Sequence, residues 1–218
     1  MSVPEFYGRW AALYDRIATL PGVARWRRAA ADALELSPGD TVVEMGCGTG
    51  ANLPHLRRRV GPEGRVVGVD LTPELLARAG ARTPEAGLLR GDATRPPVAQ
   101  ADAVLGTFVT GMFADPSGVV EAWCDLATGR VALLDLAPTD HPLGRALNPP
   151  FRAFTAASTP GATSGGVARA VLPGAPAAST LSRRVREGRD ALTDLTVERR
   201  FERFALGFCG LLSGRVVA

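Results

Sequence analysis

Apolar residues in the first two thirds of the chain gather into short runs, separated by longer stretches with helical spacing. Runs of this length, bounded by turn residues, are typical of buried strands. Because helical stretches lie between the runs, the pattern predicts an α/β fold built on a parallel sheet. The five strands are expected at residues 41–43, 65–69, 88–89, 101–108 and 130–136.

Helices are expected before, between and after these strands. Thr72, Pro73 and Glu74 form a helix start, with Thr72 as the N-cap and Pro73 in the first turn. Asp115 and Pro116 start another helix in the same way. Further helices are expected at residues 23–36, 51–59 and 181–192, and a turn is expected at residues 127–129.

The C-terminal part predicts a different kind of strand pair. Residues 196–204 and 208–217 have the composition of strands and are joined by a short turn, so we expect an antiparallel hairpin. The dinucleotide-binding Rossmann fold does not close its parallel sheet in this way. The hairpin therefore bears on the fold independently of any motif.

The most informative stretch joins the first strand to the helix after it. Glu44 is followed by a turn that holds Gly46, Gly48 and Gly50, with Cys47 between two of the glycines. Glycines let the backbone approach a ligand closely, and the start of a helix offers unpaired N–H groups. A strand, a glycine turn and a helix together predict a cofactor site at the carboxyl edge of the sheet.

The identity of that cofactor is open from the turn alone. Gly46, Gly48 and Ala51 fit the dinucleotide fingerprint G-x-G-x-x-G/A. Glu44 argues against this interpretation, because a carboxylate beside the turn would repel a pyrophosphate. A turn that only links a strand to a helix is a third possibility.

Acidic residues also follow the second and third strands. Asp70 lies twenty residues after Gly50 and could accept hydrogen bonds from both hydroxyls of a ribose. Asp92 follows the third strand, between Gly91 and Ala93. A lone Asp after a strand is usually a turn residue, but acids at three successive strand ends are more specific than any one motif.

These motifs resemble those of a known family. The pattern Glu44-x-Gly46-x-Gly48-x-Gly50 resembles motif I of the class I S-adenosylmethionine-dependent methyltransferases. Their cofactor has no phosphate, and its ammonium and sulfonium groups tolerate a nearby carboxylate. The resemblance covers about residues 10–136. It implies a Rossmann-like, mostly parallel seven-stranded sheet with a C-terminal antiparallel hairpin and helices on both faces.

The branch of the family that looks most similar contains the ubiquinone/menaquinone-biosynthesis C-methyltransferases. Besides the glycine turn and Asp70, the comparison rests on the pair Tyr14-Asp15 in the N-terminal segment. The resemblance implies S-adenosylmethionine as cofactor and S-adenosylhomocysteine as product. The cofactor-binding residues that it implies are Tyr14, Glu44, Gly46, Cys47, Gly48, Gly50, Asn52, Asp70, Leu71, Asp92, Ala93 and Thr107.

The end of the fourth strand faces the acceptor in this family. The residues there are apolar or hydroxylated, and the Asn/Asp-Pro-Pro-Tyr/Phe motif of enzymes that methylate nucleobase amines is absent. We therefore expect a small, fairly apolar acceptor, with O, C or N as the methylated atom. The residues expected to line its pocket are Trp10, Phe108, Thr110 and Met112.

His141 follows the fifth strand and is the one candidate catalytic residue. Because the pKa of histidine lies near neutrality, it could act as a general base on a hydroxyl. A histidine in a loop more often has no such role. No metal site is expected.

Two parts of the chain lie outside these motifs. Residues 1–38 are expected to form a helical lid, in which an apolar stripe either covers the cofactor or only packs on the domain. Residues 39–218 are expected to form the cofactor-binding domain. Within it, the Ser/Thr/Gly/Ala/Pro-rich segment around 142–180 is expected to be a flexible flap or a simple linker.

Composition limits the remaining classes. The chain of 218 residues has 46% hydrophobic residues, enough for one sizeable core, and no apolar run long enough for a membrane span. Its net charge of +3 comes from scattered arginines, so no nucleic-acid partner is expected. Three cysteines do not form a disulfide framework and the N-terminus does not look like a signal peptide, so we expect a cytoplasmic protein, monomeric or homodimeric.

Two other functions remain compatible with the motifs. A protein that binds S-adenosylmethionine without transferring its methyl group would share all of them. An NAD-dependent oxidoreductase would use Gly46 and Asp70 but would leave Glu44 and Asp92 unexplained.

Overall fold

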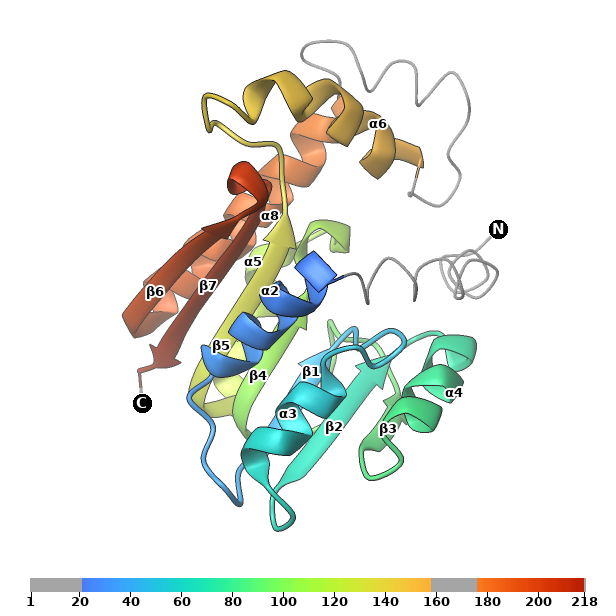
Figure 1. Ribbon diagram of the computed structural model, residues 1–218. Helices are drawn as coiled ribbons and strands as arrows, with labels where there is room; N and C mark the ends of the chain where they lie inside the picture. The colour runs from blue at the N-terminus through green and yellow to red at the C-terminus, as the bar shows by residue number, and fades with distance from the viewer. Residues whose placement is uncertain (1–20, 158–175, 218) are drawn as a thin grey trace.

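The computed structural model describes residues 21–157 and 176–217. In these residues a seven-stranded sheet has the order β3-β2-β1-β4-β5-β7-β6 (Figure 1). Strands β1 to β5 pair in parallel, whereas β7 is antiparallel to both β5 and β6. The expected fold and its closing hairpin are confirmed. The strands are β1 (Thr41–Met45), β2 (Arg65–Asp70), β3 (Gly87–Arg90), β4 (Ala101–Thr107), β5 (Ala127–Leu136), β6 (Thr196–Phe204) and β7 (Cys209–Val216).

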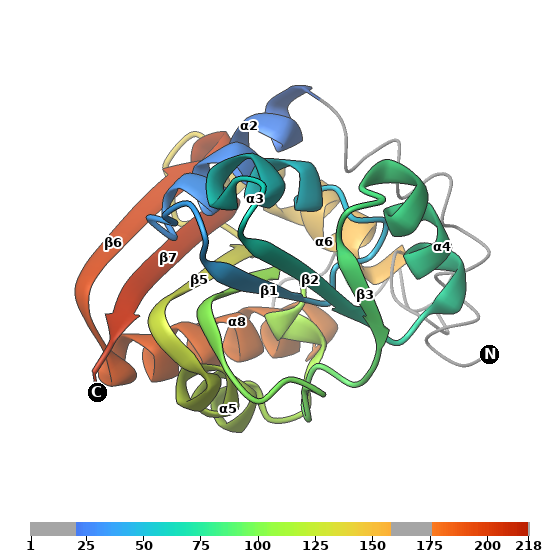
Figure 2. The same ribbon diagram turned by 90° about the horizontal axis from the view of Figure 1, so that it is seen from below.

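Helices cover both faces of the sheet (Figure 2). On one face lie α2 (Pro21–Asp32), α3 (Leu53–Val60) and α4 (Pro73–Arg82), and on the other lie α5 (Pro116–Leu126) and α8 (Pro176–Leu195). Side chains of a strand alternate between the faces. Val42 and Leu134 accordingly pack under α2 and α3, while Val43 and Leu133 pack under α5 and α8. Both faces are apolar because both are covered.

Trp123 of α5 connects the core to the loop after β3. Its side chain is fully buried, and its indole Nε1 donates a hydrogen bond to the Ala93 carbonyl at 2.8 Å. The indole ring lies against Gly106 of β4, where a Cβ atom would come within 2.5 Å of Trp123 Cζ3. A glycine in mid-strand is explained here by the close approach of a large ring.

Several element boundaries differ from the sequence prediction. The expected turn at residues 127–129 is wrong, because β5 follows α5 directly. Helix α2, expected at residues 23–36, ends at Asp32, and Glu35 beyond it has a left-handed φ of 51°. Phe108 lies outside β4 and also has a positive φ, of 58°.

The helix starts behave differently from each other. Asp115 accepts a hydrogen bond from the Gly118 N–H at 3.0 Å, so it caps α5 as expected. Thr72 occupies the N-cap position of α4, but its side chain makes no capping hydrogen bond. The Asp70 carboxylate instead accepts the Thr72 N–H at 2.8 Å.

The segment around 142–180, expected to be a flexible flap or a simple linker, is helical over much of its described part. A 3₁₀ turn, η2 (Arg145–Leu147), leads into α6 (Asn148–Ala157), which lies beyond the carboxyl end of β5 (Figure 1). Residues 145–157 are therefore helical, and a role of the segment as a flap or a linker stays a prediction. Residues 158–175 and the first part of the predicted lid, residues 1–20, lie outside the described residues. Movement of either segment stays a prediction.

The part of the chain that the structure describes has no helix suited to cross a membrane. None of its helices combines the length and the apolar composition that crossing a membrane requires.

The contact between Gly106 and Trp123 gives a test of the core. We expect Gly106→Ala to lower the free energy of unfolding by about 1–3 kcal/mol, because the added methyl group overpacks the indole. Urea denaturation measures the change. The matched control is Gly22→Ala, at the start of α2 with no atom within 4 Å of the added Cβ, and we expect no loss of stability there. Equal effects of the two substitutions would contradict the packing argument.

Candidate functional site

The glycine turn after β1 requires glycine at two positions for reasons of space as well as of conformation. Gly46 and Gly50 have φ of 67° and 73°, in the left-handed region. A Cβ on Gly46 would lie 2.8 Å from Val109 Cγ2, and a Cβ on Gly50 would lie 2.8 Å from Ala79 Cβ. The turn is thus packed tightly between α4 and the segment after β4.

Asp70, at the end of β2, holds this turn in place. Its Oδ2 accepts the Gly48 N–H at 2.9 Å, and its Oδ1 accepts the Thr72 N–H at 2.8 Å. Burial raises the pKa of the carboxyl group, and these backbone hydrogen bonds oppose the rise. A carboxylate oxygen has room for a second hydrogen bond, so Asp70 keeps acceptor capacity for hydroxyl groups of a ligand.

Glu44 lies within β1 and is fully buried. Its Oε1 accepts hydrogen bonds from the Asn52 side-chain amide and from the Thr107 hydroxyl, the latter at 3.2 Å. The same Asn52 amide nitrogen donates to Thr107 Oγ1 at 2.9 Å. A closed polar triangle therefore joins β1, the residue before α3 and the end of β4.

Two acceptor atoms of this triangle lack a hydrogen-bond donor within the described structure. They are Glu44 Oε2 and Asn52 Oδ1, both on fully buried side chains. Leaving a buried acceptor unsatisfied costs about 1–3 kcal/mol, so such atoms call for an explanation. Two acceptors on neighbouring side chains, one of them a carboxylate oxygen, fit a ligand group that carries several N–H donors and a positive charge.

Burial raises the pKa of Glu44 from its ordinary value of 4.5 to about 7. Hydrogen bonds from Asn52 and Thr107 and the positive charge of Arg27 oppose the rise, and the negative charge of Asp70 adds to it. A cationic ligand would favour the ionised form.

Arg27 of α2 belongs to the same cluster, although the sequence did not single it out. Its side chain is only 4% exposed, and its guanidinium donates from NH1 to Thr107 Oγ1 at 3.4 Å. The guanidinium carbon also lies 5.1 Å from the centre of the Phe108 ring. No motif marks this arginine among its neighbours Arg25 and Arg28, because the register of α2 on the sheet decides which of them is buried.

The candidate residues after β2 and β3 include side chains more exposed to solvent than Glu44 and Asn52. Asp92 is exposed and its Oδ1 accepts the Thr94 N–H at 2.9 Å, whereas Ala93 is buried. Leu71 is 46% exposed, as an apolar surface facing a ligand would be. Because β1, β2 and β3 are parallel neighbours, Glu44, Asp70 and Asp92 meet at one edge of the sheet. Cys47 contributes a thiol that is buried in the core.

The residues expected around the acceptor differ in accessibility. Thr110 is fully buried in a 3₁₀ turn, η1 (Thr110–Met112), and donates from Oγ1 to Asp135 Oδ2 at 2.6 Å. Burial raises the pKa of Asp135. Met112, in the same turn, is 45% exposed. Phe108 is partly buried against α2. Trp10 and Tyr14 lie outside the described residues.

His141 lies on the loop between β5 and η2, and its side chain is exposed. The backbone N–H of His141 donates a hydrogen bond to Thr139 Oγ1 at 3.0 Å, which holds the loop at this residue.

The chain matches known proteins along most of this region. A family model described as "Methyltransferase domain" matches residues 42–128. The 2-phytyl-1,4-naphtoquinone methyltransferase of Thermosynechococcus vestitus is 34% identical, over 67% of this chain and 68% of that protein. Nocamycin O-methyltransferase of Saccharothrix syringae is 33% identical, over 61% of this chain and 50% of that protein.

Among solved structures, human N-acetylserotonin methyltransferase in complex with SAM is similar with a TM-score of 0.62 and 14% identity. The match covers 97% of this chain and 56% of that one. At this identity the likeness shows the fold. Among the first curated relatives, the chain spans between 20% and 68% of the relative's length.

The buried carboxyl group of Glu44 predicts a pH dependence of stability. Its pKa is about 7 in the folded protein and 4.5 ordinarily, so the folded state binds the proton more tightly. The stabilisation that this gives is complete below pH 4.5 and is lost as the pH rises through 7. We expect Glu44→Gln, which cannot ionise, to gain about 3 kcal/mol in unfolding free energy relative to wild type between pH 4.5 and pH 8.5.

Urea denaturation of both proteins across this pH range measures the effect. Asp70 and Asp135 also have raised pKa values, but they are present in both proteins and cancel in the difference. A difference in stability that stays constant with pH would show that folding leaves the pKa of Glu44 unchanged, and would contradict the prediction.

Proposed function

Because the chain belongs to the class I S-adenosylmethionine-dependent methyltransferases, we propose that it transfers the methyl group of S-adenosylmethionine to a small, fairly apolar acceptor. Members of this family use S-adenosylmethionine as their methyl donor, so the cofactor follows from the family. The relatives include proteins named for a naphthoquinone and for the polyketide intermediate aklanonic acid. We extend that class of acceptor, with O, C or N as the methylated atom, to this chain.

The observation that carries the proposal is the pair of buried unpartnered acceptors, Glu44 Oε2 and Asn52 Oδ1. The cofactor's methionine end carries an ammonium group, which supplies N–H donors and the positive charge that such a pair needs. A pyrophosphate would bring more negative charge next to Glu44 and would leave both acceptors unsatisfied. This argues against an NAD-dependent oxidoreductase.

The remaining contacts follow the order of the strands. Asp70, already bonded to two backbone N–H groups, would accept the ribose hydroxyls with its remaining lone pairs. Asp92 and the Ala93 backbone would bind the adenine, with exposed Leu71 against one face of the ring. Tyr14 would cover the site from the N-terminal segment.

When bound, the cofactor supplies an activated methyl group for direct displacement by a nucleophile. The chain's own contribution is then alignment. Holding the methyl donor and the acceptor in a reactive geometry makes their reaction effectively unimolecular and so lowers its barrier. Asp135 would support this alignment by holding η1 through Thr110, so that Met112 would face the acceptor from a fixed turn, with Phe108 lining the pocket just before it. Thr110 is fully buried, so it would shape the acceptor pocket by supporting the residues that line it. Trp10 would complete the acceptor pocket.

Calorimetric titration tests the cofactor site. We expect wild-type protein to bind S-adenosylmethionine and S-adenosylhomocysteine but not NADH, and Asp70→Ala to lose most of this affinity because the ribose acceptor and the anchor of Gly48 are removed together. Asp194→Ala, at an exposed position near the end of α8, is the matched control and should bind as wild type. Binding of NADH alone would overturn the proposal.

Methyl transfer itself needs an acceptor series. We expect S-adenosylhomocysteine to form with quinone-like or polyketide-like aromatic acceptors. Cofactor binding without product across such a series would favour a protein that binds S-adenosylmethionine for another purpose.

His141 is proposed as a base only for a hydroxyl acceptor. With such an acceptor, His141→Asn should lower kcat, flatten the pH profile near neutrality and leave cofactor affinity unchanged. An unchanged pH profile would remove His141 from the mechanism and leave alignment alone.

A further inference from the structure

We propose that Arg27 of α2 binds the carboxylate of the cofactor's methionine end, so that α2 and the glycine-turn region together recognise a zwitterion. This inference rests on the proposed function, because it assumes that the cofactor's amino-acid end lies beside Glu44. It adds a residue that lies outside every motif of the sequence. It also predicts that the site prefers ligands that carry this carboxylate over analogues that lack it, which the motifs alone do not predict.

The first argument is that Thr107 Oγ1 connects Arg27 to the buried acceptors. Thr107 Oγ1 accepts from the Arg27 guanidinium at 3.4 Å and from the Asn52 amide at 2.9 Å, and it donates to Glu44 at 3.2 Å. Arg27 therefore lies one hydroxyl away from the unpartnered acceptors Glu44 Oε2 and Asn52 Oδ1. The site has a cation on one side and a pair of acceptors on the other.

The second argument is complementarity to the ligand end. The ammonium group donates hydrogen bonds and the carboxylate beside it accepts them, so the two need opposite partners. A guanidinium offers five N–H donors in a planar fork that matches the geometry of a carboxylate. Because Arg27 is 4% exposed, its attraction for an anion is screened little by water.

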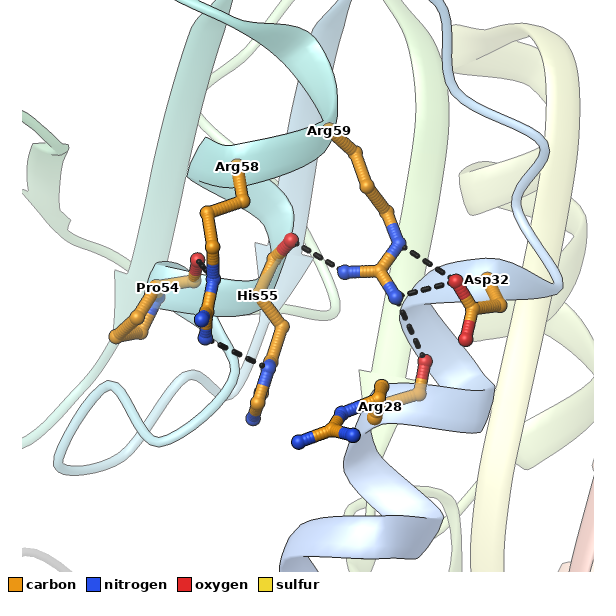
Figure 3. A network of polar contacts seen from close by, with 6 residues as sticks. All are labelled: Arg28, Asp32, Pro54, His55, Arg58 and Arg59. Atoms are coloured by element: carbon orange, nitrogen blue, oxygen red, sulfur yellow. Dashed lines mark hydrogen bonds and ion pairs between the residues drawn. The ribbon is translucent and has the colours of Figure 1, made fainter.

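The third argument is that α2 is fixed in place (Figure 3). Arg59 of α3 donates from Nε to the Asp32 carboxylate at 3.0 Å and from NH2 to the Arg28 carbonyl at 3.3 Å. Glu35, just after α2, forms ion pairs with Arg130 at 2.8 Å and Arg200 at 2.7 Å. The helix is thus tied to α3, which follows Asn52 directly, and to the sheet.

Three ligands separate the roles of the two charged groups. S-adenosylhomocysteine has both the amine and the carboxylate, its decarboxylated analogue keeps only the amine, and methylthioadenosine has neither. Titrations at pH 8.5, above the pKa of Glu44, keep that residue ionised. We expect Arg27→Met to weaken S-adenosylhomocysteine binding roughly 10- to 100-fold and to change binding of the other two ligands less than about twofold.

Two further variants sharpen the comparison. Arg27→Lys keeps the charge and loses the fork, so it should lose less affinity for S-adenosylhomocysteine than Arg27→Met does. Arg28→Met is the matched control, because Arg28 is the next residue of α2, its side chain is exposed and only its carbonyl contacts Arg59. It should bind all three ligands as wild type.

The outcomes distinguish this inference from the proposed function. An equal loss for all three ligands with Arg27→Met would show that Arg27 only maintains the shape of the site and would overturn the inference. So would unchanged binding of S-adenosylhomocysteine. If the wild-type protein bound none of the three, the proposed function would fail and the inference with it.

Discussion

A fully buried carboxylate in β1, an interior strand of the sheet, is the constraint around which the first half of the molecule is arranged. Burying a charged group is expensive unless it is hydrogen-bonded or paired. Glu44 meets this requirement with two hydrogen-bond donors, Asn52 before α3 and Thr107 at the end of β4, and with the nearby positive charge of Arg27 on α2. Even so, the pKa of Glu44 is about 7, so its ionised form destabilises the fold. A cationic ligand beside it would offset this cost.

Local patterns were enough to predict the sheet, the glycine turn and the closing hairpin. Apolar runs between turn residues are a strong signal for buried strands, and both faces of this sheet are covered. The pattern failed where tertiary contacts decide. Ala127–Gly129 was expected to be a turn, but β5 already begins at Ala127, which pairs with Ala101 of β4, and the pairing is irregular before it resumes at Arg130. No helix was predicted at residues 148–157, although Pro149 and Pro150 are compatible with the first turn of a helix, which is where α6 places them.

The candidate site was predictable only in part for a similar reason. Glu44, Asp70 and Asp92 could be found because each lies at or near the carboxyl end of a predicted strand, and parallel topology brings these ends to one edge. Arg27 has no such marker, since it is one arginine among several on an amphipathic helix. Its importance depends on which side of α2 meets the sheet, and this depends on Arg59 and Glu35, contacts far apart along the chain.

The cluster around Thr107 also has a consequence for how the molecule acquires its binding capacity. Arg27 and Thr107 are 80 positions apart, and Glu44 and Thr107 are 63 apart. Contacts of such sequence separation form only when the intervening helices and strands have closed on each other. A fragment that contains the glycine turn but ends before β4 would lack the hydroxyl that joins the cluster. The proposed cofactor site is therefore complete only when α2, β1 and β4 have come together, so binding of the cofactor there would report the long-range order of the fold.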